Sequence, residues 1–284
     1  MQWRDGCVAI ELEPVSRAQT RMLHTDIPQT VGSGEPRIGI AGWAIRREHS
    51  SRFSPVGSHL QRYATAFNCV EINSCFYRPH RRSTYERWAA SVPDDFRFAV
   101  KLPKVITHES RLAGAVPALE QFLDETAGLG ARLGPILVQL PPSFAYDAAV
   151  AESFFGDLRN RFDGEVVFEP RHETWFTGEI AELLREWRVA RVAADPARVP
   201  AAAEPGGYGG IIYYRLHGSP RVYYSAYSPE VLADTARILD EKTGEGTPVW
   251  CIFDNTALGA ATSDALEVKR LISDARRVER MTAG

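Results

Sequence analysis

The sequence predicts a single (β/α)8 barrel, a TIM-like α/β fold, on three observations. From residue 37 onward, short β-rich runs alternate with helical patterns, which is typical of repeated βα units around a parallel sheet. The 284-residue chain has the usual length of one such barrel. Nearly every predicted strand ends in a polar or ionisable residue, and the strand ends are where barrels place their sites.

The eight predicted strands are short apolar runs, as expected for strands that are covered on both faces. They are Arg37–Gly42, Cys69–Asn73, Arg97–Lys101, Pro135–Leu140, Glu165–Glu169, Val189–Asp195, Ile211–Leu216 and Pro248–Phe253. The helical patterns between them are Ser58–Phe67, Ser83–Ala90, Val116–Leu129, Ala148–Arg161, Gly178–Trp187, Pro229–Glu241 and Ser263–Ala275. Several begin with a capping residue or an early proline, such as Ser228 before Pro229.

Two segments depart from the repeat. Residues 196–210 are rich in Pro, Gly and Ala without an amphipathic pattern, so the sixth crossover is predicted to be an irregular loop. Residues 1–36 show no sustained period and end in Pro and Gly, which predicts a disordered N-terminal extension before a barrel domain at 37–280. No glycine-rich dinucleotide motif and no P-loop follow a predicted strand, so nucleotide-dependent chemistry is not expected.

Composition narrows the class of protein further. A net charge of −3 gives little attraction to nucleic acid or to an anionic membrane, and no apolar run is long enough to span a bilayer. The four cysteines, Cys7, Cys69, Cys75 and Cys251, show neither a C-x-x-C motif nor the density of a disulfide framework. We expect a cytoplasmic protein without a membrane partner, and the sequence leaves its oligomeric state unknown.

The candidate site consists of the polar residues at the predicted strand ends, which a barrel would gather at one mouth. The candidates for catalysis are Glu169, His217, Glu71 and His172. The candidates for substrate binding are Arg215, Arg171, Lys101, Asn73, His108, Gln139, Tyr77, Trp175, Asp195 and Asn255. No metal ligands are assigned.

Strand geometry favours a shared site because residues two apart point to the same face. Glu169 with Arg171, and Arg215 with His217, form such pairs. Charges gathered there must pair, and such networks are where catalysis and shifted pKa values occur. A purely structural ion-pair network stays open, as does Lys101 as an anion ligand, a salt-bridge partner or a desolvated amine nucleophile.

These residues resemble the YecE-like family, number seventy-two in the series of domains of unknown function, whose members have a TIM-barrel fold. The resemblance spans about Ile38 to Ile272. It rests on these segments in order: Val70–Asn73 with Phe76–Arg78, Phe98–Lys101 with Thr107–His108, Gln139–Pro141, Phe168–Glu169 with Arg171–His172 and Trp175, Arg215–Gly218, and Phe253–Thr256.

The chain departs from the family pattern at Cys75, where a small hydroxyl residue is usual, and in its long N-terminal extension. The family has no assigned activity. The resemblance therefore implies the barrel fold and the positions of a site, without implying a reaction.

Three functions compete at this stage. The leading hypothesis is an enzyme of the hydrolase, lyase or isomerase class, in which Arg215, Arg171 and Lys101 bind a small anionic or sugar-like substrate and Glu169 and His217 exchange protons. No cofactor is predicted by this hypothesis.

The second hypothesis is a divalent-metal phosphodiesterase or DNA-binding barrel, which the acidic net charge disfavours. Its metal ligands would be drawn from Glu71, Glu169, Asp195, His172 and His217. The third hypothesis is a non-catalytic adaptor that uses the aromatic segment 218–227 against a partner.

Overall fold

Strands and helices alternate along residues 34–282, the part of the chain that the computed structural model describes. The strands are β1 Arg37–Ile40, β2 Cys69–Ile72, β3 Arg97–Lys101, β4 Leu133–Gln139, β5 Val166–Glu169, β6 Val189–Arg191, β7 Ala193–Asp195, β8 Gly206–Gly207, β9 Ile212–Leu216 and β10 Val249–Phe253. The α-helices are α1 His59–Tyr63, α2 Ser74–Tyr77, α3 Arg82–Ala89, α4 Val116–Thr126, α5 Ala148–Arg159, α6 Gly178–Glu186, α7 Pro229–Gly244 and α8 Ala260–Thr282. The predicted extension 1–36 lies outside the described residues except for its last three.

The strands form two sheets, with the orders β1-β10-β9-β7 and β2-β3-β4-β5-β6-β8. All their pairings are parallel except that of β6 with the two-residue β8. The sheets meet at two places: an isolated parallel bridge joins Ala41 to Glu71, and only Val192 separates β6 from β7. The parallel α/β fold predicted from the sequence is confirmed.

The sixth predicted strand is divided because its two halves serve different neighbours. β6 pairs with β5, whereas β7 pairs with β9. The following crossover contains a short 3-10 helix at Pro200–Ala203 and then β8, with no α-helix in residues 196–211. Gly207 has φ +66, a backbone conformation that favours glycine, so this irregular crossover follows from the local sequence.

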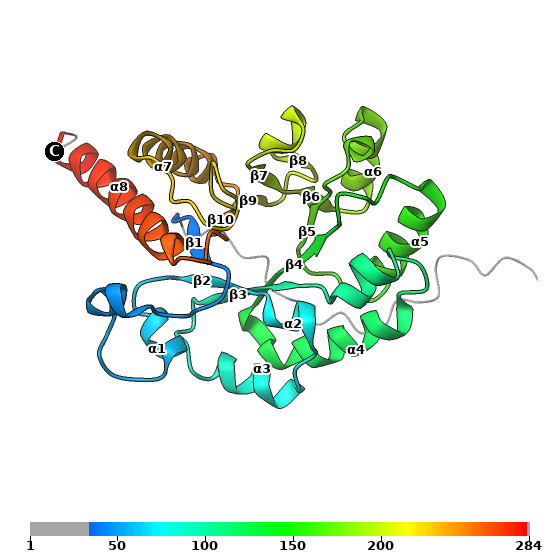
Figure 1. Ribbon diagram of the computed structural model, residues 1–284, viewed down its shortest axis with the longest axis horizontal. Helices are drawn as coiled ribbons and strands as arrows, with labels where there is room; N and C mark the ends of the chain where they lie inside the picture. The colour runs from blue at the N-terminus through cyan, green and yellow to red at the C-terminus, as the bar shows by residue number, and fades with distance from the viewer. Residues whose placement is uncertain (1–33, 283–284) are drawn as a thin grey trace, which may run out of the picture.

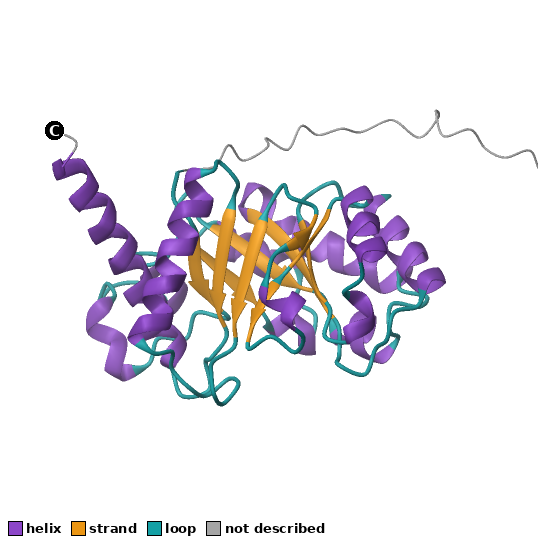
Figure 2. Ribbon diagram, turned by 90° about the horizontal axis from the view of Figure 1, so that it is seen from above, coloured by secondary structure: helices purple, strands orange, loops and turns teal. Residues whose placement is uncertain are grey.

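The helices lie around the outside of the strands (Figures 1 and 2). Their starts follow the local sequence: Ser58 and Gln61 form a capping box before α1, and Ser228 caps α7 ahead of Pro229. The buried faces of the helices join the outward faces of the strands in the main hydrophobic core. The helices therefore cover the sheets while the opposite strand faces remain on the inside.

A second, smaller apolar cluster lies on those inner faces and combines residues from both sheets. Its members are Cys69, Ala99, Leu137, Val167, Ala190, Val192, Ile211, Tyr213, Trp250 and Ile252. Cys69 and Cys251, like Cys75, are buried free thiols. Because side chains alternate along a strand, the residues two positions after these apolar ones face the same interior, one layer nearer the strand ends.

Gly39 provides a test of how closely β1 and β2 approach. A Cβ atom at residue 39 would lie 2.3 Å from the carbonyl oxygen of Cys69. This oxygen belongs to the backbone of β2 and cannot move away without distorting the strand. We expect Gly39→Ala to lower the free energy of unfolding by about 1–3 kcal/mol, measured by urea denaturation. Gly156→Ala is the matched control, since nothing lies near that position in α5 and the change should raise stability by up to about 1 kcal/mol. Equal effects at the two positions would contradict the close approach.

Candidate functional site

The interior residues nearest the strand ends are polar on six strands of the two sheets. Each stands two positions after a member of the inner apolar cluster. They are Glu71, Lys101, Gln139, Glu169, Arg215 and Asp254. Together with Arg171 and His217, which continue the same alternation beyond Glu169 and Arg215, they are called the polar cluster below.

Arg215 is the centre of the polar cluster and has no exposed surface. Its Nη2 and Nε atoms donate to the two oxygens of Glu71 at 2.7 and 3.0 Å, which is a bidentate pair. Its Nη1 atom donates to Glu169. Nη2 also lies 3.1 Å from Asp254 Oδ2. One guanidinium thus holds carboxylates from β2, β5 and the end of β10, which compensates the cost of burying them.

Glu169 accepts hydrogen bonds from two further side chains of the polar cluster. Arg171 Nε donates to Glu169 Oε1 at 2.8 Å, and Gln139 Nε2 donates to the same oxygen at 3.1 Å. Burial alone would raise the pKa of the Glu169 carboxyl, but the charges of Arg215, Arg171 and His217 hold it well below its ordinary value. Glu169 is therefore ionised at neutral pH.

His217 lies between two carboxylates. Its Nδ1 atom is 3.1 Å from Asp254 Oδ2 and its Nε2 atom is 3.3 Å from Glu169 Oε1. Burial lowers the pKa of His217, yet the two carboxylates outweigh burial and the pKa is raised. An imidazolium that donates from both nitrogens satisfies this geometry.

Lys101 has the opposite environment. Its Nζ atom lies 4.0 Å from the centroid of the Phe76 ring, and no hydrogen bond or ion pair joins it to any residue of 34–282. Burial and the positive charge of Arg215 lower its pKa from the ordinary 10.5 to about 8. Lys101 is the cation of the polar cluster that has no carboxylate of its own.

The charges of the polar cluster do not cancel. Three carboxylates, those of Glu71, Glu169 and Asp254, face the cations of Arg215, Arg171 and Lys101. With His217 protonated, the polar cluster carries one net positive charge. Such an imbalance in a desolvated site favours an anionic ligand.

Three predicted binding residues lie at the edge of this arrangement. His108 follows β3 in a π-helix, Val105–Glu109, and its pKa is lowered by burial and by the charges of Lys101 and Arg171. Asn73 follows β2, and its buried Oδ1 atom has no hydrogen-bond partner among the described residues. Tyr77 is 74% exposed, with its ring edge-on to Phe76, and lies outside the polar cluster.

The other predicted residues serve local structure. His172 caps a 3-10 helix by accepting from the backbone of Thr174, and Trp175 is 1% exposed with its indole donating to the Phe144 carbonyl oxygen. The hydroxyl of Tyr227 donates to Asp195 at 2.8 Å. Asn255 Nδ2 donates to the Ser225 carbonyl oxygen and to Asp264. No sequence motif distinguished these residues from those of the polar cluster.

The residues predicted for catalysis and substrate binding did not include Asp254 or Tyr213, and Tyr223 was considered only as part of the aromatic segment 218–227. Asp254 is the first residue after β10 and contacts both Arg215 and His217. Tyr213 is completely buried and donates to Glu71 at 2.9 Å. Tyr213 could have been found from its alternation with Arg215 and His217 along one strand. Asp254 could have been found from its position directly after a predicted strand.

The segment 218–227 folds back over the end of β9. Gly218 has φ +92, and a Cβ atom there would meet the Ser225 carbonyl oxygen at 2.7 Å. Tyr223, 38% exposed, places its hydroxyl 3.4 Å from Arg171 Nη1 and its ring edge-on to His217. The aromatic segment thus covers one side of the polar cluster.

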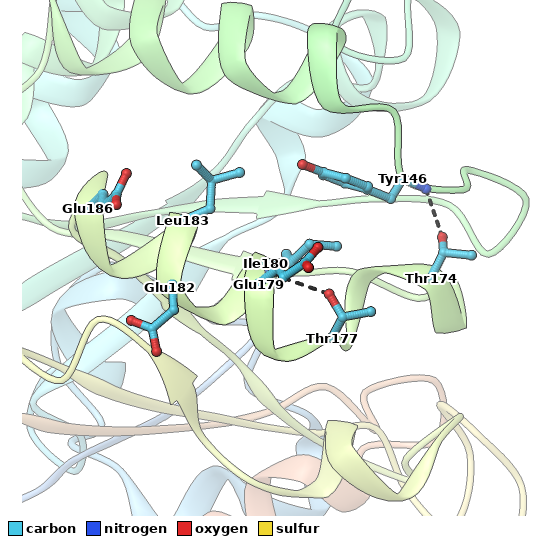
Figure 3. A pocket seen from close by; sticks show the side chains of 8 residues that line it. All are labelled: Tyr146, Thr174, Thr177, Glu179, Ile180, Glu182, Leu183 and Glu186. Carbon is cyan, nitrogen blue, oxygen red and sulfur yellow. Dashed lines mark hydrogen bonds between the residues drawn. The ribbon is translucent and has the colours of Figure 1, made fainter.

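A separate hollow lies on the outer surface along α6 (Figure 3). It has a volume of about 360 Å³ and an acidic lining that includes Glu179, Glu182 and Glu186. None of the residues of the polar cluster lines it, and its charge would repel an anion. The hollow therefore has no part in the site at the strand ends.

Of the predicted metal donors, Glu71, Glu169 and His217 lie in the polar cluster, whereas Asp195 and His172 lie outside it. Glu71 and Glu169 are held by Arg215, while Asp195 and His172 make the local contacts described above. Within residues 34–282, no group of three or more His, Cys, Asp and Glu side chains is arranged to hold a metal ion. None of the helices in these residues has the length and apolar character needed to cross a bilayer.

A family model described as a protein of unknown function, DUF72, matches residues 37–283. The chain belongs to this family. The UPF0759 protein YecE of Escherichia coli K12 is 33% identical over 149 residues, which cover 50% of this chain and 54% of that protein. The chain thus spans about half the length of the E. coli relatives that it matches. The UPF0759 protein YunF of Bacillus subtilis is 23% identical over 270 residues, covering 83% of this chain and 94% of that protein.

Solved structures of DUF72 family proteins share the fold. The protein from Enterococcus faecalis has a TM-score of 0.71 at 20% identity, covering 84% of this chain and 95% of that one. The protein from Thermotoga maritima has a TM-score of 0.69 at 23% identity, covering 84% and 99%. The family resemblance found in the sequence is confirmed, and so is its α/β fold.

Replacing Arg215 tests the central ion pairs. Arg215→Met should lower the free energy of unfolding at pH 7.5 by about 3–5 kcal/mol, because it leaves buried carboxylates without their cation. The loss should shrink at pH 5, where protonation relieves those carboxylates. The measurement is urea denaturation at both pH values. Arg237→Met, which removes an exposed i,i+4 pair with Glu241, is the control and should change stability by less than about 1 kcal/mol.

Replacing Lys101 should have the opposite effect. Lys101→Met removes a buried ammonium without a carboxylate partner, so stability at pH 7 should rise by about 1–3 kcal/mol. The folded-state pKa of about 8 lies below the ordinary 10.5, so the wild type loses its penalty as pH rises through this window. The difference between the two proteins should therefore vanish toward pH 10.5. A variant less stable than the wild type at pH 7 would indicate a structural role for Lys101.

Proposed function

We propose that this protein is an enzyme that binds a small anionic, polar or sugar-like substrate at the polar cluster and acts on it by proton transfer. The observation that carries this proposal is the unpaired, buried ammonium of Lys101 in a cluster with net positive charge. A structural network would be expected to satisfy its own charges, since an unpaired buried ion costs stability. Ligand-binding sites commonly keep buried charges that lower the stability of the fold, because those charges bind the ligand.

The proposal divides the residues by role. Lys101 and Arg171 bind the negative charge of the substrate, with Asn73 and His108 at the same edge. Glu169 and His217, which lie 3.3 Å apart, exchange protons with the substrate: the raised pKa of His217 makes it the proton donor, and the lowered pKa of Glu169 keeps its carboxylate ionised beside it. Arg215 and Glu71, which are sealed from solvent, position these groups.

We also infer that the two sheets act as one eight-stranded barrel. The bridge from Ala41 to Glu71 and the continuity of β6 with β7 through Val192 support closure. The inner apolar cluster supports it as well, since it takes residues from both sheets. A barrel would place the polar cluster on the carboxyl-terminal face, where TIM-barrel enzymes carry their sites.

Anion binding is the direct test of this proposal. The wild type should bind at least one anion from a panel of inorganic phosphate, sulfate, sugar phosphates and hydroxy acids, measured by calorimetry at low salt. Lys101→Met and Arg171→Gln should each weaken that binding at least about tenfold, which corresponds to 1.4 kcal/mol. Lys104→Met is the matched control, because Lys104 pairs with Glu109 at the surface and its loss should leave binding unchanged.

Two results would count against the proposal. If no anion in the panel binds to the wild type, the net positive charge of the polar cluster does not serve a ligand. If Lys101→Met and Lys104→Met bind the same anion equally well, the site lies elsewhere in the protein.

A further inference from the structure

The lysines of the sequence are Lys101, Lys104, Lys242 and Lys269, and Lys101 differs from the others. Lys104 pairs with Glu109 at 2.9 Å and Lys242 pairs with Glu245 at 2.9 Å. Lys269 donates to the carbonyl oxygen of Ala66. Among these lysines, only Lys101 has no oxygen acceptor within residues 34–282.

The surroundings of Lys101 make its ammonium easier to deprotonate than that of an ordinary lysine. The Phe76 ring covers its Nζ atom, and the backbone carbonyl of Lys101 is itself occupied by the Cys75 thiol. Burial and Arg215 bring the pKa of the ammonium to about 8, so the neutral form is a minor fraction at pH 7 and rises to about half at pH 8. Nζ is not among the fully enclosed atoms that lack a partner, so it keeps some contact with solvent.

We propose that Lys101 is an amine nucleophile that forms an imine with the carbonyl carbon of an aldehyde or ketone substrate carrying an anionic group. The inference rests on the proposed function and specifies its substrate class and its chemistry. An ammonium needed only for charge would gain from a carboxylate or water-exposed position, whereas a nucleophile needs an unprotonated lone pair, and a carboxylate partner would favour the protonated form. The geometry around Nζ meets the second requirement.

The chemical step needs no oxidant or reductant. The lone pair of neutral Nζ forms a bond to the carbonyl carbon, and the carbonyl π electrons move to oxygen; nitrogen then releases one proton and the oxygen takes up one, which gives a neutral carbinolamine. The carbinolamine then loses its hydroxyl as water, with one proton supplied from solvent, and a protonated imine remains. The positive imine can withdraw electrons from a neighbouring carbon, as proton transfer or carbon–carbon cleavage requires.

The charged neighbours fit such a substrate. Arg171 and His108 lie on the same side as Lys101, close enough that both cations, Arg171 and Lys101, lower the pKa of His108. Arg171 can hold the anionic group while His108 remains neutral. The carboxylates of Glu71, Glu169 and Asp254 act on Lys101 in the opposite direction to Arg215, and the sum leaves its ammonium easier to deprotonate than an ordinary lysine.

Reductive trapping tests the inference on the full-length protein. The protein is incubated with pyridoxal 5′-phosphate at pH 8, reduced with borohydride and mapped by mass spectrometry of its peptides. Labelling should occur on Lys101 at least about tenfold faster than on Lys104 or Lys242, which serve as internal references. Pyridoxal without its phosphate should label Lys101 more slowly, because Arg171 has no anion to hold. Competing inorganic phosphate should slow labelling by the phosphorylated probe.

Lys101→Arg separates this inference from the proposed function. The variant keeps a positive charge in the polar cluster but lacks a nucleophilic amine, so the selective label should disappear. If the wild type binds phosphate but Lys101 is labelled no faster than Lys104, the imine is refuted and anion binding stands. If Lys101 is labelled selectively by both probes at the same rate and phosphate does not bind, the amine chemistry stands and the anion site is refuted.

Discussion

The shared guanidinium of Arg215 is the interaction on which the interior of this protein depends. Three carboxylates point toward it from β2, β5 and the end of β10; those of Glu71 and Glu169 are buried, and that of Asp254 is 13% exposed. Their mutual repulsion would be severe without a central cation. The positions of Glu169 and His217, and through them the edge formed by Arg171, therefore follow from one buried side chain.

The layered interior explains why this arrangement is possible. Below the polar cluster, small and aromatic side chains such as Ala99 and Trp250 fill the space and exclude water. Above it, the segment 218–227 brings Tyr223 against His217. Charges held between these layers interact strongly because little solvent screens them. The same lack of solvent makes the unpaired ammonium of Lys101 costly, and this cost lowers its pKa to about 8.

Much of the fold could be predicted from sequence, because apolar runs and capping residues are local signals. The divided strand at Val192 could not, since its two halves are determined by neighbours far along the chain. The same distinction applies to the site. Glu169, Arg215 and His217, which were predicted to lie together, are in contact in the structure. Trp175 belongs to the same sequence motif as Glu169, but its side chain packs into the core. Whether a polar residue faces inward depends on register and on loop geometry beyond the strand end, which periodicity does not encode.

The sheet order also constrains how the chain assembles. β1 has its hydrogen-bonded partner in β10, some two hundred residues later, and the bond from Arg215 to Glu71 spans 144 positions. During synthesis, β1 waits for β10 and the Glu71 carboxylate waits for Arg215, until these later segments have been made. Non-local pairing of this kind is slow and leaves strand edges exposed to wrong partners. The pairing of β1 with β10 is therefore expected to be a slow step in folding.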